Sequence, residues 1–234
     1  MSLTPNVSHM LEENTHSDMA NYNPVTPGIV ESLISTNSTG DSNVLSVDAK
    51  QNGIWAACAI FNGTLDLGSL GGTGQGSIES RGESDILIFG GSSLLSVSWY
   101  SHLDGVGENV CWGVSLLPNN LVLTYGTYEE SISIGSSTKY SEGKKDSFVG
   151  LYNVSIGAWT HVSDFGGPED DEIYSMSQHA SGFSAVGRTN SDLTNSTGLG
   201  VFTFGTKDCS NNPCGMVLDF SSELSLSKGN LVSS

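Results

Sequence analysis

Basic residues are scarce in this chain. Its 234 residues include eight Lys and Arg against 25 Asp and Glu, which gives a formal net charge of −17 at pH 7. A nucleic acid or an anionic membrane surface would repel such a chain, so we expect neither as a partner. The excess of acid is typical of a surface that keeps a protein soluble. Affinity for Ca²⁺ or for a basic partner protein is the alternative.

Long apolar runs are also lacking. No stretch is long and apolar enough for a membrane-spanning helix, and the first residues, MSLTPNVSHM, have neither the basic nor the apolar segment of a signal peptide. Nowhere do apolar residues recur at the spacing of an amphipathic helix over a dozen positions. The 29 glycines and the many Ser, Thr and Asn are instead typical of short strands joined by tight turns. The composition therefore predicts an all-β fold without a membrane span.

What is present is a pattern that occurs three times. The most regular copy has a Gly-rich acidic turn, an alternating strand at 173–177, a polar turn, and a second strand at 183–187. Earlier copies begin their first strands at Val110 and Val44, where the last copy has Ile173. The offsets are 173 − 110 = 63 and 110 − 44 = 66 residues. Strand, tight turn and strand make a hairpin, so we predict three hairpins.

The similarity between the copies continues past the hairpins. Each copy has a third apolar run, which begins at Asp85, Asp146 and Gly200 respectively. Each of the first two copies ends with a fourth run, which contains Trp99 in the first copy and Trp159 in the second. Four short antiparallel strands per repeat are typical of a β-propeller blade, whose faces are buried by stacking on neighbouring blades.

These turns and strands resemble the SBBP-type β-propeller repeat family over roughly residues 40–220. That family couples a Gly-Gly-x-x-Asp-Asp/Glu turn to an alternating strand, then to a strand ending in Gly-x-Thr, and later to an Asp-x-Phe-Val strand. The first copy departs from this motif at Ser42 and Asn43, where the acidic pair is expected. The family is defined by its fold, so the resemblance implies a scaffold and no particular chemistry. The matching residues are Gly166, Gly167, Asp170, Asp171, Gly187, Arg188 and Thr189 in the third copy, and Gly126, Thr127, Asp146, Phe148 and Val149 in the second.

The repeats divide the chain into two parts. Residues 1–28 are polar, contain three prolines and show no regular periodicity, so we predict a polar arm or a disordered tail. Residues 29–234 are the predicted β-propeller repeat domain, with repeats at about 41–105, 106–167 and 168–228. This is three blades, whereas propellers have about four to eight, so one chain cannot close a ring.

Two chains of three blades would make a six-bladed ring, and we therefore expect a homodimer. A chain that is a fragment of a longer propeller is the alternative. Residues 34–40 resemble the fourth strand of the later copies, and we expect this strand to complete the final blade, because an unpaired outer strand invites pairing. At the other end, residues 216–220 predict one clear strand and residues 223–227 a weaker one.

Cysteines are few, and their spacing separates them into two kinds. Cys209 and Cys214 lie in a turn-like stretch between two strands, so we predict that they form a disulfide. Cys58 and Cys111 lie in apolar strands and are predicted to be free, buried, small apolar residues. One disulfide favours an oxidising compartment, and thus an extracellular or cell-surface location.

The acidic turns recur once per repeat and should lie on one rim of the propeller. Oxygen ligands that recur on one rim suit a ring of Ca²⁺ sites, one per blade, which makes Asp41, Glu108, Asp170 and Asp171 candidate calcium ligands. Turn chemistry explains Asp, Asn and Gly at these positions without any ion. We predict no other cofactor.

Aromatic residues that recur at equivalent positions should have a structural role, so we predict that Trp99 and Trp159 pack between blades. Aromatic residues that do not recur are better candidates for an exposed surface that binds a glycan or a protein. Arg188 is one of only eight basic residues. It either pairs with a carboxylate such as Asp192 or binds a ligand. The non-recurring aromatic residues are Trp55, Trp112, Tyr125 and Tyr128.

No set of residues in the sequence makes a catalytic signature. The five histidines are scattered, although His102 and His161 fall at nearly matching positions in their repeats, which favours a structural role. The predicted first strands carry almost no charge, which disfavours a catalytic channel. We therefore predict a non-enzymatic recognition or scaffold protein that binds a protein or glycan through rim loops at 64–84 and 128–145. The alternatives are a hydrolase or lyase with its site in the axial channel, and a structural surface or virion component.

Overall fold

The computed structural model describes residues 17–22, 30–36, 38–70, 76–92, 97–191, 209 and 212–232. These residues form strands throughout, with short 3-10 turns at Leu67–Leu70 and Pro118–Asn120, so the all-β prediction is confirmed. None of the described helical turns is long and apolar enough to cross a membrane.

Most strands belong to three successive four-stranded antiparallel meanders. Two short hairpins, β1–β2 and β5–β6, complete the described strands. The first meander contains β3 (Ser42–Ala49), β4 (Trp55–Phe61), β7 (Asp85–Gly91) and β8 (Trp99–Val106). The second contains β9 (Asn109–Leu116), β10 (Leu121–Ile134), β11 (Ser137–Asn153) and β12 (Ala158–Phe165). The third contains β13 (Asp171–His179), β14 (Gly182–Thr189), β15 (Cys214–Ser221) and β16 (Leu226–Val232). The short hairpins are β1 (Ser17–Tyr22) with β2 (Val30–Thr36), and β5 (Thr64–Asp66) with β6 (Ser77–Glu79).

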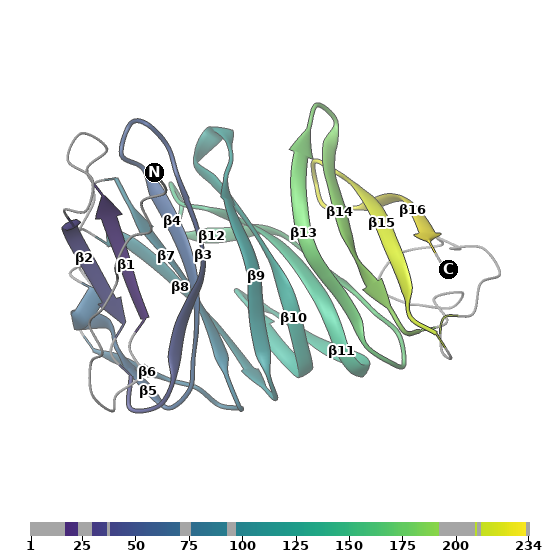
Figure 1. Cartoon of the computed structure of the whole chain (residues 1–234), viewed down its shortest axis with the longest axis horizontal. Coiled ribbons are helices and arrows are strands. Elements are labelled where there is room, and N and C mark those ends of the chain that lie inside the picture. The colour runs from purple at the N-terminus through teal and green to yellow at the C-terminus, as the bar shows by residue number, and fades with distance from the viewer. Residues whose placement is uncertain are drawn as a thin grey trace, which may run out of the picture.

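The meanders follow one another along the long axis of the molecule, with β1–β2 at one end and β13–β16 at the other (Figure 1). The first strands of the second and third meanders each pack across the preceding meander: β9 lies against β3 and β4, and β13 lies against β9, β10 and β11. The long strand β10 also pairs with β8 through Ser131 and its neighbours, which joins the first two meanders into one curled sheet.

Apolar side chains fill the spaces between the meanders. Nearly every residue of β4 and all of β7 are buried, because both faces of these central strands are covered. One cluster, which includes Ile88 and Phe148, lies between the first and second meanders. Another, which includes Val149 and Phe183, lies between the second and third. The meanders are therefore held together mainly by burial of apolar surface.

The ends of the chain differ from the sequence-based expectations. Strand β1 occupies part of the predicted arm or tail at 1–28 and pairs with β2, where no regular structure was expected. The expected fourth strand at 34–40 overlaps the end of β2, but β2 lies at the opposite end of the molecule from β16 and does not complete the last meander (Figure 1).

Three further differences concern the third repeat and one predicted loop. Strand β15 pairs directly with β14, so it takes the third place in the meander that was predicted for residues 200–205, which lie outside the described residues. The weak strand predicted at 223–227 begins instead at Leu226, because Leu224 is buried in a turn with φ of 58°. The predicted rim loop at 128–145 is a continuation of the β10–β11 hairpin.

Candidate functional site

The same β-bulge occurs in the first strand of all three meanders. In β3 the register shifts after Val44, in β9 after Cys111 and in β13 after Ile173, and each shift leaves one residue without a partner on the next strand. Cys111, rather than Val110, therefore occupies the place of Ile173. The residue that each bulge leaves unpaired is Leu45, Trp112 or Tyr174.

All three bulge residues are large, apolar and exposed. Their exposed fractions are 41% for Leu45, 39% for Trp112 and 44% for Tyr174. A bulge redirects a side chain that regular pleating would place elsewhere. The bulge thus occurs at three equivalent places, and each time it exposes an apolar side chain to solvent.

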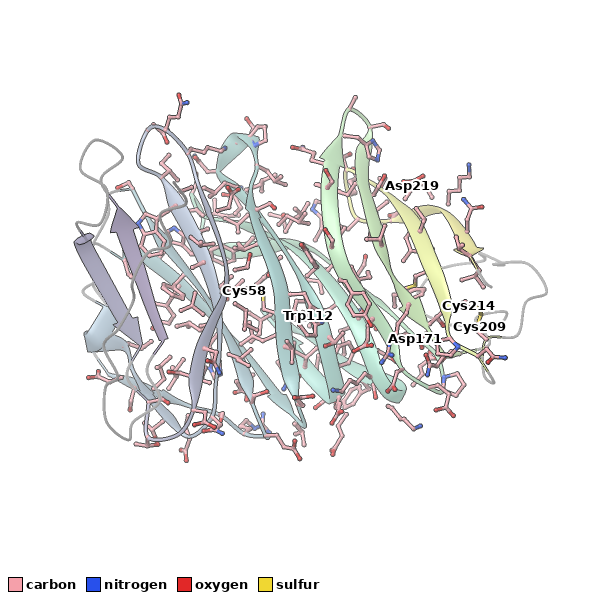
Figure 2. The ribbon with its side chains drawn as sticks, viewed as in Figure 1. Cys58, Trp112, Asp171, Cys209, Cys214 and Asp219 are labelled. Carbon is pink, nitrogen blue, oxygen red and sulfur yellow. A yellow bond between two sulfur atoms is a disulfide. The ribbon has the colours of Figure 1, made fainter. Side chains whose placement is uncertain are left out.

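Trp112 and Tyr174 contact each other across the boundary between the second and third meanders. Their rings meet edge to face, with centroids 6.2 Å apart. Figure 2 shows Trp112 on β9, beside the third meander. An edge-to-face pair is a favourable arrangement that leaves one ring face open. The pair therefore forms a small rigid aromatic surface.

An ion pair adjoins these rings. The Tyr174 hydroxyl donates to Glu172 Oε2 at 2.8 Å, and Arg188 Nε donates to the same oxygen at 2.5 Å. Burial, and then the neighbouring Glu172 carboxylate, raises the pKa of Tyr174 to about 12, so the hydroxyl stays a donor at neutral pH. Arg188 pairs here with Glu172; the partner suggested by the sequence, Asp192, lies outside the described residues. Trp112, Tyr174, Glu172 and Arg188 are called the aromatic patch below.

The other predicted ligand-binding residues are not exposed, so that prediction is wrong for Trp55, Tyr125 and Tyr128. Their exposed fractions are 2%, 7% and 0%. Trp55 packs edge to face on Phe89, and burial followed by neighbouring acids raises the pKa of Tyr128. These residues lie on β4 and β10, where neighbouring strands and the adjacent meander cover both faces.

Trp99 and Trp159 pack between meanders as predicted. Trp99 of the first meander stacks on Tyr152 of the second, with centroids 5.4 Å apart. Trp159 of the second meander donates its indole N–H to Ser101 Oγ of the first at 3.0 Å. Each indole also covers a glycine, Gly90 or Gly150, where a Cβ would lie 2.5 or 2.4 Å from the ring.

A groove of about 550 Å³ runs beside Trp159, and no pattern in the sequence predicted it. Its lining includes Tyr100 of β8, which is 39% exposed, and His161 of β12. It lies between the outer strands of two meanders, so it depends on how the meanders pack. Its mixture of aromatic and hydroxyl groups makes it a secondary candidate for ligand binding.

The four candidate calcium ligands lie at the starts of β3, β9 and β13, one group for each meander. Asp41 and Glu108 line a pocket of about 200 Å³ together with Glu83, but Glu108 also forms an ion pair with Lys145. Asp171 is buried away from this pocket, where its Oδ2 accepts hydrogen bonds from the Gly167 amide and the Ser191 hydroxyl at 2.8 and 2.6 Å. Calcium binding therefore stays a prediction.

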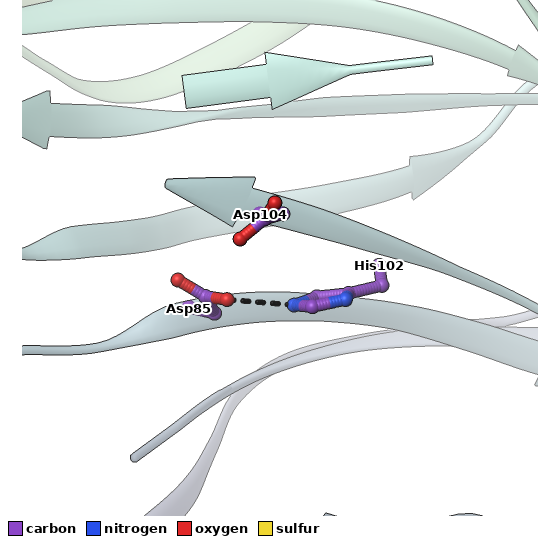
Figure 3. Close-up of side chains that lie close together, drawn as sticks. All are labelled: Asp85, His102 and Asp104. Atoms are coloured by element: carbon purple, nitrogen blue, oxygen red, sulfur yellow. Dashed lines mark hydrogen bonds and ion pairs between the residues drawn. The ribbon is translucent and has the colours of Figure 1, made fainter. Parts of the chain in front are cut away.

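One group of three potential metal ligands is present in the described part of the chain. It consists of Asp85, His102 and Asp104, whose ligand atoms lie within 4.8 Å of one another (Figure 3). His102 Nε2 lies 2.7 Å from Asp85 Oδ2. His161 is not equivalent to His102 here, because its Nδ1 lies 3.2 Å from the hydroxyl of the neighbouring Thr160 and it does not belong to this group. Matching the two histidines by position in the sequence concealed this cluster.

The cysteines form two disulfides, Cys209–Cys214 and Cys58–Cys111 (Figure 2). The first was predicted. The prediction that Cys58 and Cys111 are free is wrong: they join β4 to β9 with Cα atoms 6.4 Å apart, within the range of normal disulfides. Two disulfides in one chain are typical of proteins from oxidising compartments.

No family model matches the chain, and no curated protein is significantly similar to it.

Proposed function

We propose that this chain is a β-propeller-type recognition module that binds a glycan through the aromatic patch. Three observations support the propeller. The strands form four-stranded antiparallel meanders, the first strand of each meander carries the same bulge, and successive meanders pack face to face. In a propeller the first strand of each blade lies next to the axis. Leu45, Trp112 and Tyr174 would then face the axial channel.

The aromatic patch carries the proposal for the ligand. An exposed ring face packs well on the C–H face of a sugar, and an exposed guanidinium offers donors for sugar hydroxyls. Trp112 and Tyr174 supply the first, and Arg188, which is held in place by Glu172, supplies the second. These four residues come from three strands of two meanders, so the fold holds them in fixed positions.

The charged residues of the first strands favour recognition over catalysis. Asp48 accepts a hydrogen bond from the Leu116 amide, Asp171 is held by Gly167 and Ser191, and Glu172 is shared by Tyr174 and Arg188. Each of these acids thus has a structural partner. Neither a hydrolase or lyase nor a virion component is favoured by a specific observation.

We also propose that two copies of the chain assemble. The outward face of the first meander packs against the β5–β6 hairpin through Leu65 and Ile78, but the outward face of the third exposes Val186 and Val217, at 47% and 38%. These residues lie directly opposite each other on β14 and β15. A meander of a second copy would cover them in the way that β13 covers β10.

The glycan proposal is tested on an array of immobilised saccharides, followed by calorimetry with the saccharide that binds best. The wild-type chain should bind, and Trp112→Ala should weaken binding at least tenfold. Tyr140→Ala is the matched control, because Tyr140 is an aromatic residue of β11 that is 71% exposed and lies outside the patch. A wild-type chain that binds no saccharide, or a Trp112→Ala variant that binds like the control, would overturn the proposal. Binding to a protein instead would assign the patch to that class of ligand.

A further inference from the structure

Neighbouring strands bring Asp85, His102 and Asp104 to one face of the first meander. His102 of β8 lies opposite Leu87 of β7, and Asp85 and Asp104 lie at the same end of this strand pair. Because side chains alternate between faces along a strand, residues 102 and 104 share a face with residues 85 and 87. The arrangement depends on strand register and is independent of the aromatic patch.

The oxygens of the two carboxylates are used unequally. Asp85 Oδ1 accepts a hydrogen bond from the Gly105 amide at 3.2 Å, and its Oδ2 lies 2.7 Å from His102 Nε2. Asp104 Oδ2 accepts from Arg81 Nη1 at 2.9 Å. Asp104 Oδ1 is buried and has no hydrogen-bond partner. Figure 3 shows one carboxylate oxygen of Asp104 directed toward the Asp85 carboxyl group.

A buried carboxylate oxygen without a partner is costly, because it has lost water and gained no donor in return. The nearby acid cannot relieve this cost, since Asp85 is itself entirely buried and is an acceptor when ionised. A cation beside Asp104 Oδ1 would satisfy that oxygen. It would also reduce the repulsion between the two carboxylates.

We propose that these three side chains bind one divalent transition-metal ion of the Zn²⁺ class. The donors are Asp85 Oδ2, His102 Nε2 and Asp104 Oδ1, whose residues form the cluster defined above. One imidazole nitrogen with two carboxylate oxygens suits Zn²⁺, whereas Ca²⁺ takes oxygen ligands throughout. Gly105 N–H and Arg81 occupy the remaining carboxylate oxygens and would fix the orientation of both acids, as outer ligands do in metal sites.

The geometry requires a small local change. Two ligands at about 2.1 Å from a tetrahedral ion lie roughly 3.4 Å apart. The Asp85–His102 pair is now at 2.7 Å, so it must widen by less than 1 Å. His102 and Asp104 keep side-chain exposures of 20% and 29%, which leaves room for water as a further ligand. The site thus resembles an accessible site more than a closed structural one.

To bind the ion through Nε2, the ring of His102 would carry its hydrogen on Nδ1. The groups that face the imidazole are Asp85 and the ring of Phe61, with Asp104 and Arg81 next to them.

The test is calorimetry with Zn²⁺ on the full chain after treatment with EDTA. The wild-type chain should bind one ion in a saturable manner. His102→Gln and Asp104→Asn should each weaken binding at least tenfold. His161→Gln is the matched control on β12, and its affinity should not change. Retention of zinc by the His102→Gln variant would show that the ion binds elsewhere, and Ca²⁺ binding without Zn²⁺ binding would exclude the transition-metal assignment.

A second measurement needs no variant and therefore does not depend on whether variants fold. The imidazole ¹⁵N resonances of the five histidines are recorded in the wild-type chain with and without Zn²⁺. The Nε2 resonance of one histidine, assigned to His102, should shift on saturation with one ion. If no histidine resonance shifts, or if only those outside the cluster do, the proposal is wrong. Failure of this test would leave the glycan proposal unaffected, because the aromatic patch contains no residue of the cluster.

Discussion

Cys58 of β4 and Cys111 of β9 form a covalent bond across the boundary between the first and second meanders. Cys111 is also the residue at which the bulge of β9 begins, so the bond fixes the strand that carries Trp112. The disulfide therefore attaches the strand that carries Trp112 of the aromatic patch to the first meander.

This bond should contribute more to stability than the other disulfide. Cys58 and Cys111 are 53 residues apart, whereas Cys209 and Cys214 are five apart. The entropy of closing these loops in the unfolded chain corresponds to about 4 and about 2 kcal/mol. Urea unfolding of Cys58→Ala/Cys111→Ala should thus show the larger loss of free energy of unfolding, with Cys209→Ala/Cys214→Ala as the comparison. A larger loss of free energy of unfolding in the Cys209→Ala/Cys214→Ala variant would contradict the long-range bond.

Asp146 should make stability depend on pH. Burial, and then nearby Asp171, Glu142 and Asp164, raises its pKa to about 7 despite a hydrogen bond from the Glu142 amide. A raised pKa means that the folded state binds the proton more tightly than the unfolded state. The free energy of unfolding that proton binding by Asp146 contributes is complete below about pH 4, and it is lost as the pH rises through about 7.

Asp146→Asn removes this titration and should unfold at a higher urea concentration than the wild type at pH 8, with a smaller difference at pH 5. Glu223→Gln, an exposed change in the turn before β16, is the control and should match the wild type at both values. Asp171, whose pKa burial raises to about 6, should add a similar loss at slightly lower pH. An Asp146→Asn variant with unchanged pH dependence would contradict this account.

The bulge in β13 should require glycine at position 187. A Cβ added there would lie 1.9 Å from the Glu172 carbonyl oxygen, which is backbone and cannot move aside freely. Gly187→Ala should therefore lower the free energy of unfolding by about 2 kcal/mol, the range of overpacking in ordered structure. Gly215→Ala on the neighbouring β15 is the control, since its Cβ would be 3.5 Å from the nearest atom. Equal stability of the two variants would be inconsistent with the bulge geometry.

Assembly is checked by light scattering on a size-exclusion column. The wild-type chain should have the mass of a dimer. The Val217→Glu variant should have the mass of a monomer, because dimer formation would bury the new charge on the outward face of the third meander. Ile156→Glu changes a residue that is 66% exposed in the turn between β11 and β12, and it should leave the dimer intact. A monomeric wild type would rule out the two-copy assembly.

The local architecture could be predicted from the sequence. Alternating apolar residues and turn residues located the strands at 173–177 and 183–187, which fall within β13 and β14, and the same period located the earlier hairpins. The short spacing of Cys209 and Cys214 was enough to predict their bond. These features depend on residues close together in the chain.

Which of these residues are available for function depends on how the meanders pack against one another. Alternation along a strand separates two faces, but it does not say whether a neighbouring meander covers one or both. Trp55 and Trp112 therefore looked alike in the sequence, although one is 2% and the other 39% exposed. The Cys58–Cys111 bond and the cluster around His102 also escaped detection. They depend on strand register and on packing between distant segments, which a linear pattern does not contain.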